Sequence, residues 1–412
     1  MSATGFISSA RVWWAGALIV GTLTGCATGP AVMTPQQPPP KATSQAATPE
    51  PVTYADFRDL PVDPAVLPWF AWDDRQPLPA AKRQSTSQWQ PVKWRDVPAW
   101  GSDNLERAWA ALLRNCEGAP AAIKPHCDAA RQLSIGTAEQ RIAWLMQQWQ
   151  PYKVTDFNGD ASGLLTGYYE PMMTASRLRT DTHQTPLYAK PDSLRPGQTW
   201  YSRKDMEVNP AALDALRGKE IAWVADPIDA LIVQIQGSGR VEITEPDGRV
   251  QVARLAFAAH NGHTYASVAR VLLDTRAITS PSWPAIKAWA AANPDDVQRV
   301  LWTNPRTVFF QEEDLNGMDA QAGPRGAQGV PLTPMRSIAV DRRSIAYGTP
   351  VWMVTRGPTF NSARLVVAQD TGGAIIGAVR ADFFAGWGED AAVLAGGLKQ
   401  PLELWVLWPR GL

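Results

Sequence analysis

The stretch VVAQDTGGAIIGAVRADFF, residues 366–384, carries the features on which the fold and the chemistry of this chain depend. An apolar run leads to Asp370, which we expect to end a strand, and Asp382 follows a second, short expected strand and precedes two phenylalanines. A strand-end aspartate is usually a turn former, because its carboxylate accepts bonds from nearby backbone N–H groups. Apolar surroundings, however, raise a carboxyl pKa above its ordinary value of about 3.9, as a general acid requires. Asp382 is therefore the first candidate for such an acid.

The sequence on both sides of this stretch is typical of short strands separated by turns. A third aspartate, Asp341, ends an apolar segment and precedes the turn-forming sequence YGTPV at 347–351. From about residue 162 onward, β-branched and aromatic residues bounded by Gly, Pro and Asp predict strands. The expected strands are 166–171, segments within 221–243, 306–310, 337–340, 350–355, 364–368 and 402–407.

A smaller part of the chain has the apolar spacing of amphipathic helices. One expected helix covers 105–112, and a second starts at Thr137, where Gln140 completes the pattern of a capping box. Two more are expected at 265–274 and 285–292. The expected fold class is therefore mainly β with some helices.

Length and composition limit the classes of protein to which the chain can belong. Its 412 residues suffice for two domains or one large one, and 45% hydrophobic with 19% charged residues is typical of a globular protein. Lys plus Arg and Asp plus Glu are 39 each, so no charge imbalance indicates nucleic acid as a partner. The 19 tryptophans have faces suited to sugar rings, although most tryptophans pack in cores.

The N-terminus has the pattern of an exported lipoprotein. Arg11 precedes an apolar run at 12–20 that is too short to span a bilayer but suits a signal peptide. The Leu-Thr-Gly-Cys sequence that ends at Cys26 resembles a bacterial lipobox, which implies cleavage before Cys26 and lipid attachment to its sulfur. An ordinary signal peptide with a fortuitous cysteine is the alternative. No acidic residue follows Cys26, which favours an outer-membrane location facing the periplasm, and the Pro-rich segment 27–53 is expected to be a tether.

Two further cysteines, Cys116 and Cys127, lie close together in the sequence. In an oxidising periplasm we expect them to form a disulfide, which would stabilise the protein by about 3 kcal/mol in the chain-entropy model. A metal site is the alternative, but His126 would add only one further ligand.

Carboxylates remain as the candidate catalytic groups, because the motifs of metal sites and of nucleophilic serines are not found. The four histidines include no His-Glu-x-x-His pattern, and no Gly-x-Ser-x-Gly elbow occurs. An Asp-Thr-Gly at 370–372 occurs once, without the second copy that an aspartic peptidase needs.

Several motifs in this order resemble the three-aspartate domain of the membrane-bound lytic murein transglycosylase A family. They are Asp341 with YGTP at 347–350, AQDTGGAI at 368–375, ADFF at 381–384 and, upstream, TGYYEP at 166–171, QIQGSG at 234–239 and NGH at 261–263. The resemblance covers roughly residues 160–408. It implies a double-psi β-barrel formed by 54–171 plus 309–412, a second, smaller β-domain inserted at 172–308, and a groove between them for a glycan strand.

The resemblance also implies an activity, the cleavage of the β-1,4 bond between N-acetylmuramic acid and N-acetylglucosamine with a 1,6-anhydro product. Asp382 matches the catalytic acid, and Asp370 and Asp341 match the other two aspartates. Ordinary glycosidases need two carboxylates, but here the C6 hydroxyl of the substrate attacks, so that one carboxyl can act first as acid and then as base. Asp370 either raises the pKa of Asp382 by like-charge repulsion or forms a turn beneath the site.

Polar residues and glycines in the upstream motifs are candidates for substrate contact. They are Thr166, Gly167, Tyr168 and Glu170 on the barrel and Gln236, Ser238 and Gly239 on the inserted domain. Hydroxyls and amides suit sugar groups, and glycines let the backbone approach a ligand. Taken alone, QIQGSG also fits a hairpin turn after a strand. No cofactor is implied; the expected partners are peptidoglycan strands, the membrane through lipid on Cys26, and other cell-wall enzymes.

Two other functions fit the same residues. A muramidase would use Asp382 as acid and Asp370 as base and would leave reducing muramic ends. A non-catalytic lipoprotein that binds murein would tether the outer membrane to the wall, and its binding would survive Asp382→Asn.

Overall fold

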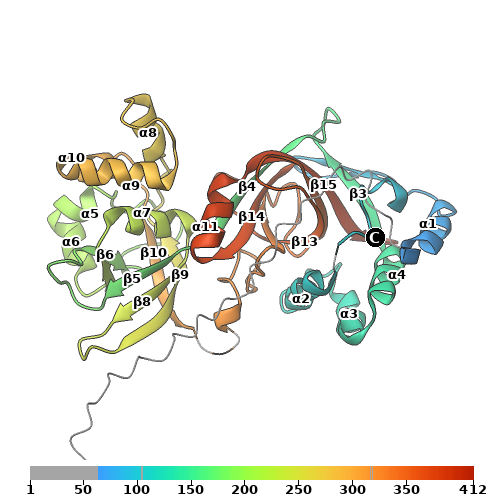
Figure 1. Cartoon of the computed structure of the whole chain (residues 1–412), viewed down its shortest axis with the longest axis horizontal. Coiled ribbons are helices and arrows are strands. Elements are labelled where there is room, and N and C mark those ends of the chain that lie inside the picture. Colours follow the sequence, from blue (N-terminus) through green and yellow to red (C-terminus); the bar gives the residue numbers. More distant parts are fainter. Residues whose placement is uncertain (1–63, 104, 316, 318) are drawn as a thin grey trace, which may run out of the picture. The chain divides into compact units, whose positions relative to one another are not determined.

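The computed structural model describes residues 64–412, apart from residues 104, 316 and 318 (Figure 1). The expected signal peptide with Cys26 and the tether 27–53 lie outside the described residues. Among the helices that are described, none combines the length and the apolar character needed to cross a bilayer.

Six strands close into a barrel. Around the barrel the order is β15-β12-β13-β11-β14-β4, and β4 pairs with β15 to complete the ring. The pairs β11–β13 and β14–β4 are parallel and the others are antiparallel. These strands are β4 (Gly163–Glu170), β11 (Ser337–Val340), β12 (Pro350–Thr355), β13 (Ser362–Asp370), β14 (Arg380–Trp387) and β15 (Lys399–Pro409). The closed ring, which leaves these strands without a free edge, confirms the expected double-psi β-barrel.

Alternate residues of the barrel strands face two different cores. On β12, Val351 and Met353 belong to the core inside the barrel, whereas Trp352 and Val354 pack outside it against the N-terminal helices. All six residues of β12 are buried, because both faces of the strand are covered. This double burial explains why the strands read as nearly continuous apolar runs in the sequence.

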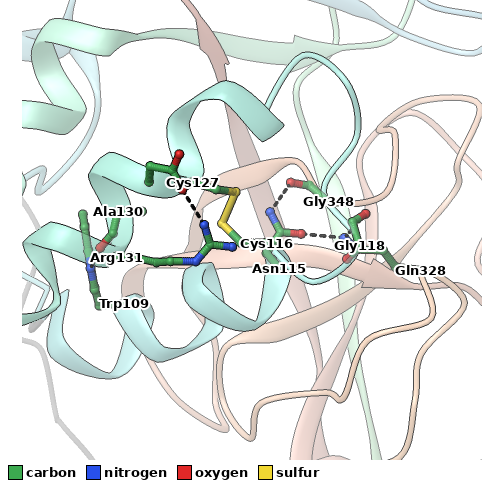
Figure 2. The surroundings of a disulfide bond; sticks show 10 residues. Trp109, Asn115, Cys116, Gly118, Cys127, Ala130, Arg131, Gln328 and Gly348 are labelled. Carbon is green, nitrogen blue, oxygen red and sulfur yellow. Dashed lines mark hydrogen bonds and ion pairs between the residues drawn. A yellow bond between two sulfur atoms is a disulfide. The ribbon is translucent and has the colours of Figure 1, made fainter.

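The N-terminal part of the described chain covers one side of the barrel. Its strands β1 (Lys82–Arg83), β2 (Gln88–Pro91) and β3 (Trp149–Thr155) extend the sheet beyond β15. Its helices are α1 (Leu67–Asp74), α2 (Leu105–Asn115), α3 (Cys127–Gln132) and α4 (Ala138–Gln148). Thr137 and Gln140 form the predicted capping box at the start of α4. A disulfide joins Cys116 to Cys127 with an S–S distance of 2.14 Å and a Cα–Cα distance of 5.7 Å (Figure 2).

A second sheet has six strands in the order β10-β9-β8-β5-β7-β6. They are β5 (Met172–Ser176), β6 (Thr185–Tyr188), β7 (Glu220–Val224), β8 (Gly239–Thr244), β9 (Val250–His260) and β10 (Val308–Asp314). The helices within this part of the chain are α5 (Asp205–Val208), α6 (Pro210–Leu216), α7 (Pro227–Gln236), α8 (Val268–Asp274), α9 (Trp283–Ala292) and α10 (Pro294–Leu301). A further helix, α11 (Gly388–Gly397), follows β14 of the barrel and packs against β4 and β14. Apolar residues of α7, of α8–α10 and of α11 share one core with Tyr169 of β4.

Two local expectations were wrong. The segment 221–243 is not made of strands and turns alone, because its centre forms α7, which has Asp226 as N-cap, Pro227 in its first turn and Gly237 in a left-handed conformation at its end. These are standard helix boundaries, and the helix reads as a strand because it is buried on two sides, against the second sheet and against α8–α10. Asp382 also lies inside β14 rather than after a short strand.

Candidate active site

Several candidate residues lie along strand β4. Thr166, Tyr168 and Glu170 are every second residue of this strand. They therefore share one face, because successive side chains of a strand point to opposite faces. The three side chains bond to Asp382, to Asp370 and to two arginines of the second sheet, respectively. One face of one strand therefore connects both carboxyl groups of the site with the inserted sheet.

The catalytic candidate Asp382 lies on β14, which pairs with a strand on each side. It lies opposite Thr166 of β4 and Ala339 of β11. The Thr166 hydroxyl donates to Oδ1 of Asp382 at 2.5 Å, and it accepts a bond from Nη2 of Arg380 at 2.7 Å. Burial raises the pKa of Asp382, while the Thr166 bond and the charge of Arg380 offset part of the rise. The result is a carboxyl that retains its proton more readily than a free aspartic acid does.

The second carboxyl, Asp370, ends β13 as expected and accepts bonds on both oxygens. The Tyr168 hydroxyl donates to Oδ2 at 2.8 Å, and the Ala327 N–H donates to Oδ1 at 2.9 Å. Burial raises the pKa of Asp370, the donors lower it, and the charge of Asp382 raises it again, so Asp382 lies near enough to act on the ionisation of Asp370. The pKa of Tyr168 is held well above its ordinary value by burial and by the charge of Asp370, so this hydroxyl remains a donor.

The third aspartate, Asp341, is placed differently. It directly follows β11, is buried, and accepts bonds from Nε and Nη2 of Arg343 at 3.0 and 2.8 Å. It also accepts the Gly377 N–H at 3.1 Å, from the loop that joins β13 to β14. The Arg343 bonds lower the pKa of Asp341, and the backbone bonds add to this effect. Asp341 is therefore an ionised anchor for the loop that links Asp370 to Asp382.

Glu170, expected to contact substrate, is placed at the junction with the second sheet. Its side chain is 0% exposed, and it accepts bonds from Nε of Arg240 at 2.8 Å and Nε of Arg254 at 2.6 Å. Both arginines also donate to the Ala322 carbonyl, and the guanidinium of Arg240 lies 3.7 Å from the ring centroid of Trp387. A carboxylate enclosed in this way has no surface to offer a sugar, so we correct its assignment to a structural one.

The motif QIQGSG does not form a hairpin, because it spans the end of α7 and the start of β8. Oε1 of Gln236 accepts the N–H of Tyr169 at 3.1 Å, so this side chain fastens α7 to β4. Ser238 is buried, and a Cβ on Gly239 would lie 2.6 Å from Val233, so Gly239 allows close packing.

On the barrel side, a Cβ on Gly167 would lie 2.7 Å from the Cα of Ala395, so this glycine lets α11 approach β4. The structure thus brings Thr166 and Tyr168 to the carboxyl pair, whereas Gly167, Gln236 and Gly239 join elements of the fold.

Sequence reasoning missed Arg380 and the Ala327 N–H. Arg380 lies two residues before Asp382 on the same strand, and this period-two spacing is a signal that could have identified it. No comparable signal exists for Ala327, because it comes from a loop distant in sequence from Asp370. Within residues 64–412, as far as they are described, no three His, Cys, Asp or Glu side chains converge as metal ligands.

The geometry brings two half-buried carboxyl groups, Asp370 and Asp382, together on the wall of a closed six-stranded barrel that is joined to a second β-sheet, an arrangement suited to acid–base chemistry. Family models match this chain in two places: an MltA specific insert domain at residues 164–311 and a 3D domain at residues 336–408.

The relatives agree with the family models. The membrane-bound lytic murein transglycosylase A of Vibrio cholerae is 30% identical over 289 residues, which are 65% of this chain and 74% of that protein. The lytic transglycosylase LtgG of Burkholderia pseudomallei has a TM-score of 0.55 and 40% identity, covering 81% of this chain and all of that one. MltA from Neisseria gonorrhoeae has a TM-score of 0.69 and 26% identity, covering 82% of this chain and 96% of that one. The chain belongs to the membrane-bound lytic murein transglycosylase A family, whose members are peptidoglycan-cleaving lyases.

Proposed function

We propose that the protein cleaves peptidoglycan glycan strands at the β-1,4 bond between N-acetylmuramic acid and N-acetylglucosamine and leaves a 1,6-anhydromuramoyl end. Asp382 acts first as general acid and then as general base. The observation that carries this proposal is the half-buried carboxyl of Asp382, which has a raised pKa, lies near Asp370 and accepts a bond from Thr166.

The hydrogen bonds favour Asp382 over Asp370 as the proton donor. Both oxygens of Asp370 accept bonds, from Tyr168 and Ala327, which supports its role as a fixed carboxylate. At Asp382, by contrast, a bond within the described part of the chain is found only at Oδ1, from Thr166. The proton that is transferred therefore belongs on Oδ2 of Asp382, while Thr166 keeps the carboxyl plane fixed.

The two proton transfers balance on this single carboxyl. Oδ2–H of Asp382 gives its proton to the leaving glycosidic oxygen as the bond to the anomeric carbon breaks. The resulting carboxylate then removes the proton of the C6 hydroxyl as that oxygen attacks the same carbon. No water is consumed, and the acid is regenerated. A negative charge on Asp370 favours the protonated form of Asp382 at the start of the cycle.

The test is mass spectrometry of the products that the purified full-length chain, kept in detergent, releases from murein sacculi. We expect muropeptides one water lighter than hydrolytic ones, which are the 1,6-anhydro products. Reducing muramic ends would mean a hydrolase and would assign the base to Asp370. Binding of sacculi without any release would mean a murein-binding protein.

We further propose that the chain is lipid-anchored to the outer membrane and faces the periplasm, through cleavage before Cys26 and acylation of its sulfur. The lipobox and the absence of an acidic residue after Cys26 support this. Labelling of cells with a fatty acid analogue should mark the wild-type chain but not Cys26→Ser. Labelling that survives this substitution would contradict the proposal.

A further inference from the structure

The loop at 323–332 presents two consecutive N–H groups to the end of β13. The Ala327 N–H donates to the Asp370 carboxylate at 2.9 Å, and the Gln328 N–H donates to the Gln369 carbonyl at 3.0 Å. The loop lies close against the barrel, because a Cβ on Gly326 would lie 2.4 Å from the Gln369 carbonyl oxygen. A bond to Asp370 that comes from a loop requires the loop itself to be held in place.

The side chain of Gln328 holds this loop against the N-terminal helices. Its Nε2 donates to Oδ1 of Asn115 at 2.6 Å and to the Gly118 carbonyl at 3.2 Å. Asn115 is the last residue of α2 and is 1% exposed, and its Nδ2 donates in turn to the Gly348 carbonyl at 2.8 Å. Gly348 connects this network back to β13, because its N–H donates to the Ala368 carbonyl at 2.7 Å, two residues before Asp370.

The disulfide lies directly beside this network (Figure 2). Cys116 follows Asn115, and its bond to Cys127 closes the loop that contains Gly118. The two acceptors of the Gln328 amide therefore lie at this covalently closed loop: Asn115 directly precedes it, and the Gly118 carbonyl lies inside it. A cross-link of this kind restricts the motion of the residues it encloses.

We propose that Gln328 is a positioning residue for Asp370, and that the Cys116–Cys127 disulfide stabilises the platform, Asn115 and the Gly118 carbonyl, on which Gln328 rests. Gln328 does not touch the reacting atoms. It keeps the Ala327 N–H on Asp370, which favours the ionised form of that carboxyl and fixes its orientation. The inference rests on the proposed function for its effect on turnover, but the geometry of Asp370 can be measured without turnover.

The decisive variant is Gln328→Glu, which has the same shape but turns an oxygen toward the two oxygens of the platform. We expect kcat for release of anhydro-muropeptides to fall about tenfold, the effect of weakening one bond to a charged group, with little change in KM. Because the Ala327 N–H lowers the pKa of Asp370, its loss should raise that pKa and move the acid limb of the pH–rate profile to higher pH.

Two further variants separate positioning from general damage. Gln328→Lys restores a donor to both platform oxygens and should recover kcat to within about threefold of the wild type. Gln321→Glu makes the same chemical change at an exposed residue of the neighbouring segment and should leave kcat and the pH profile unchanged. Wild-type kcat and pH profile in Gln328→Glu would overturn the proposal.

The pKa of Asp370, measured by NMR of its carboxyl carbon and assigned with Asp370→Asn, gives a readout that does not depend on activity. It should rise in Gln328→Glu and not in Gln321→Glu, and an unchanged value would overturn the positioning role. If the wild type releases no anhydro-muropeptides, the proposed function fails, while this measurement still decides the role of Gln328.

The role of the disulfide is tested by replacing both cysteines with serine. The double serine variant should lower kcat in the same direction as Gln328→Glu, and the two changes combined should lower it by less than the product of their separate effects, because they act through one network. Fully multiplicative effects would show that the disulfide acts apart from Gln328.

Discussion

Glu170→Gln should destabilise the protein strongly without removing a substrate contact. The Glu170 side chain is fully buried between Arg240 and Arg254, with N–O distances of 2.8 and 2.6 Å. Glutamine keeps the shape of the side chain but removes its negative charge, which balances the two buried guanidinium groups bonded to it. Breaking a buried ion pair in this way costs about 3–5 kcal/mol.

The structure favours the lower end of that range. Glutamine retains one acceptor oxygen, and the two arginines keep bonds to backbone carbonyls, Arg240 to Ala320 and Ala322 and Arg254 to Ala322. We therefore expect a loss of about 3 kcal/mol in the free energy of unfolding. In a chain of this size the melting temperature should fall by about 6 °C.

Urea unfolding, followed by both far-UV circular dichroism and tryptophan fluorescence, measures this loss. Coincidence of the two transitions is required before a free energy is taken from them. Glu242→Gln is the matched control, because Glu242 is exposed on β8, the strand that carries Arg240, and its substitution should change the free energy by less than about 0.5 kcal/mol. Adding Arg254→Met to Glu170→Gln should recover part of the loss, because it removes one of the uncompensated charges.

The reasoning is refuted by one combination of results. If Glu170→Gln unfolds at the wild-type urea concentration but binds soluble chito-oligosaccharides more weakly, then Glu170 contacts the glycan. The buried ion pair seen here would then not describe the working enzyme.

Three further outcomes follow from the carboxyl groups. Asp382→Asn should lower turnover about 10²–10⁴-fold, the usual contribution of a general acid. It should also raise or preserve stability at neutral pH, because a carboxyl whose pKa is raised by folding costs stability at pH values above its ordinary pKa. A variant that is both active and less stable would contradict this. Thr166→Val removes a donor that lowers the pKa of Asp382, so the alkaline limb of the pH–rate profile should move to higher pH, whereas Thr166→Ser should leave it in place. The pKa of Asp341 is lowered by Arg343, so Asp341 stabilises the fold at pH values above its ordinary pKa of about 3.9 and loses this effect as the pH falls below that value. The difference in urea midpoint between wild type and Asp341→Asn should therefore shrink as the pH is lowered over that range. A constant difference would argue against an ionised anchor.

The sequence predicted the C-terminal strands well because each is a short apolar run between turn signals. The expected strands 337–340 and 350–355 coincide with β11 and β12, and β13 and β15 extend a few residues beyond the expected 364–368 and 402–407. The same rule failed at α7, where burial on both sides removes the polar face that identifies a helix. Its boundary residues, Asp226 and Gly237, carried the correct signal.

The site was harder to predict because its bonds join distant parts of the chain. The sequence offered Asp370, Asp382 and Thr166 as candidates, but the bond between Thr166 and Asp382 joins residues 216 positions apart. Such pairing depends on the parallel register of β4 and β14, in which Thr166 lies opposite Asp382. No local pattern specifies that register, because each strand alone would tolerate other partners.

The alternation along β4 shows why one motif mixes chemical and structural residues. Thr166 and Tyr168 face the carboxyl pair, and Glu170 on the same face bonds to the second sheet, whereas Tyr169 on the other face enters the core shared with α7 and α11. A slip of β4 by one residue would turn all of these side chains to the wrong faces at once. The buried pair of Glu170 with Arg254 opposes such a slip, because it would leave those charges unpaired. Glu170 therefore supports the register that places Thr166 opposite Asp382.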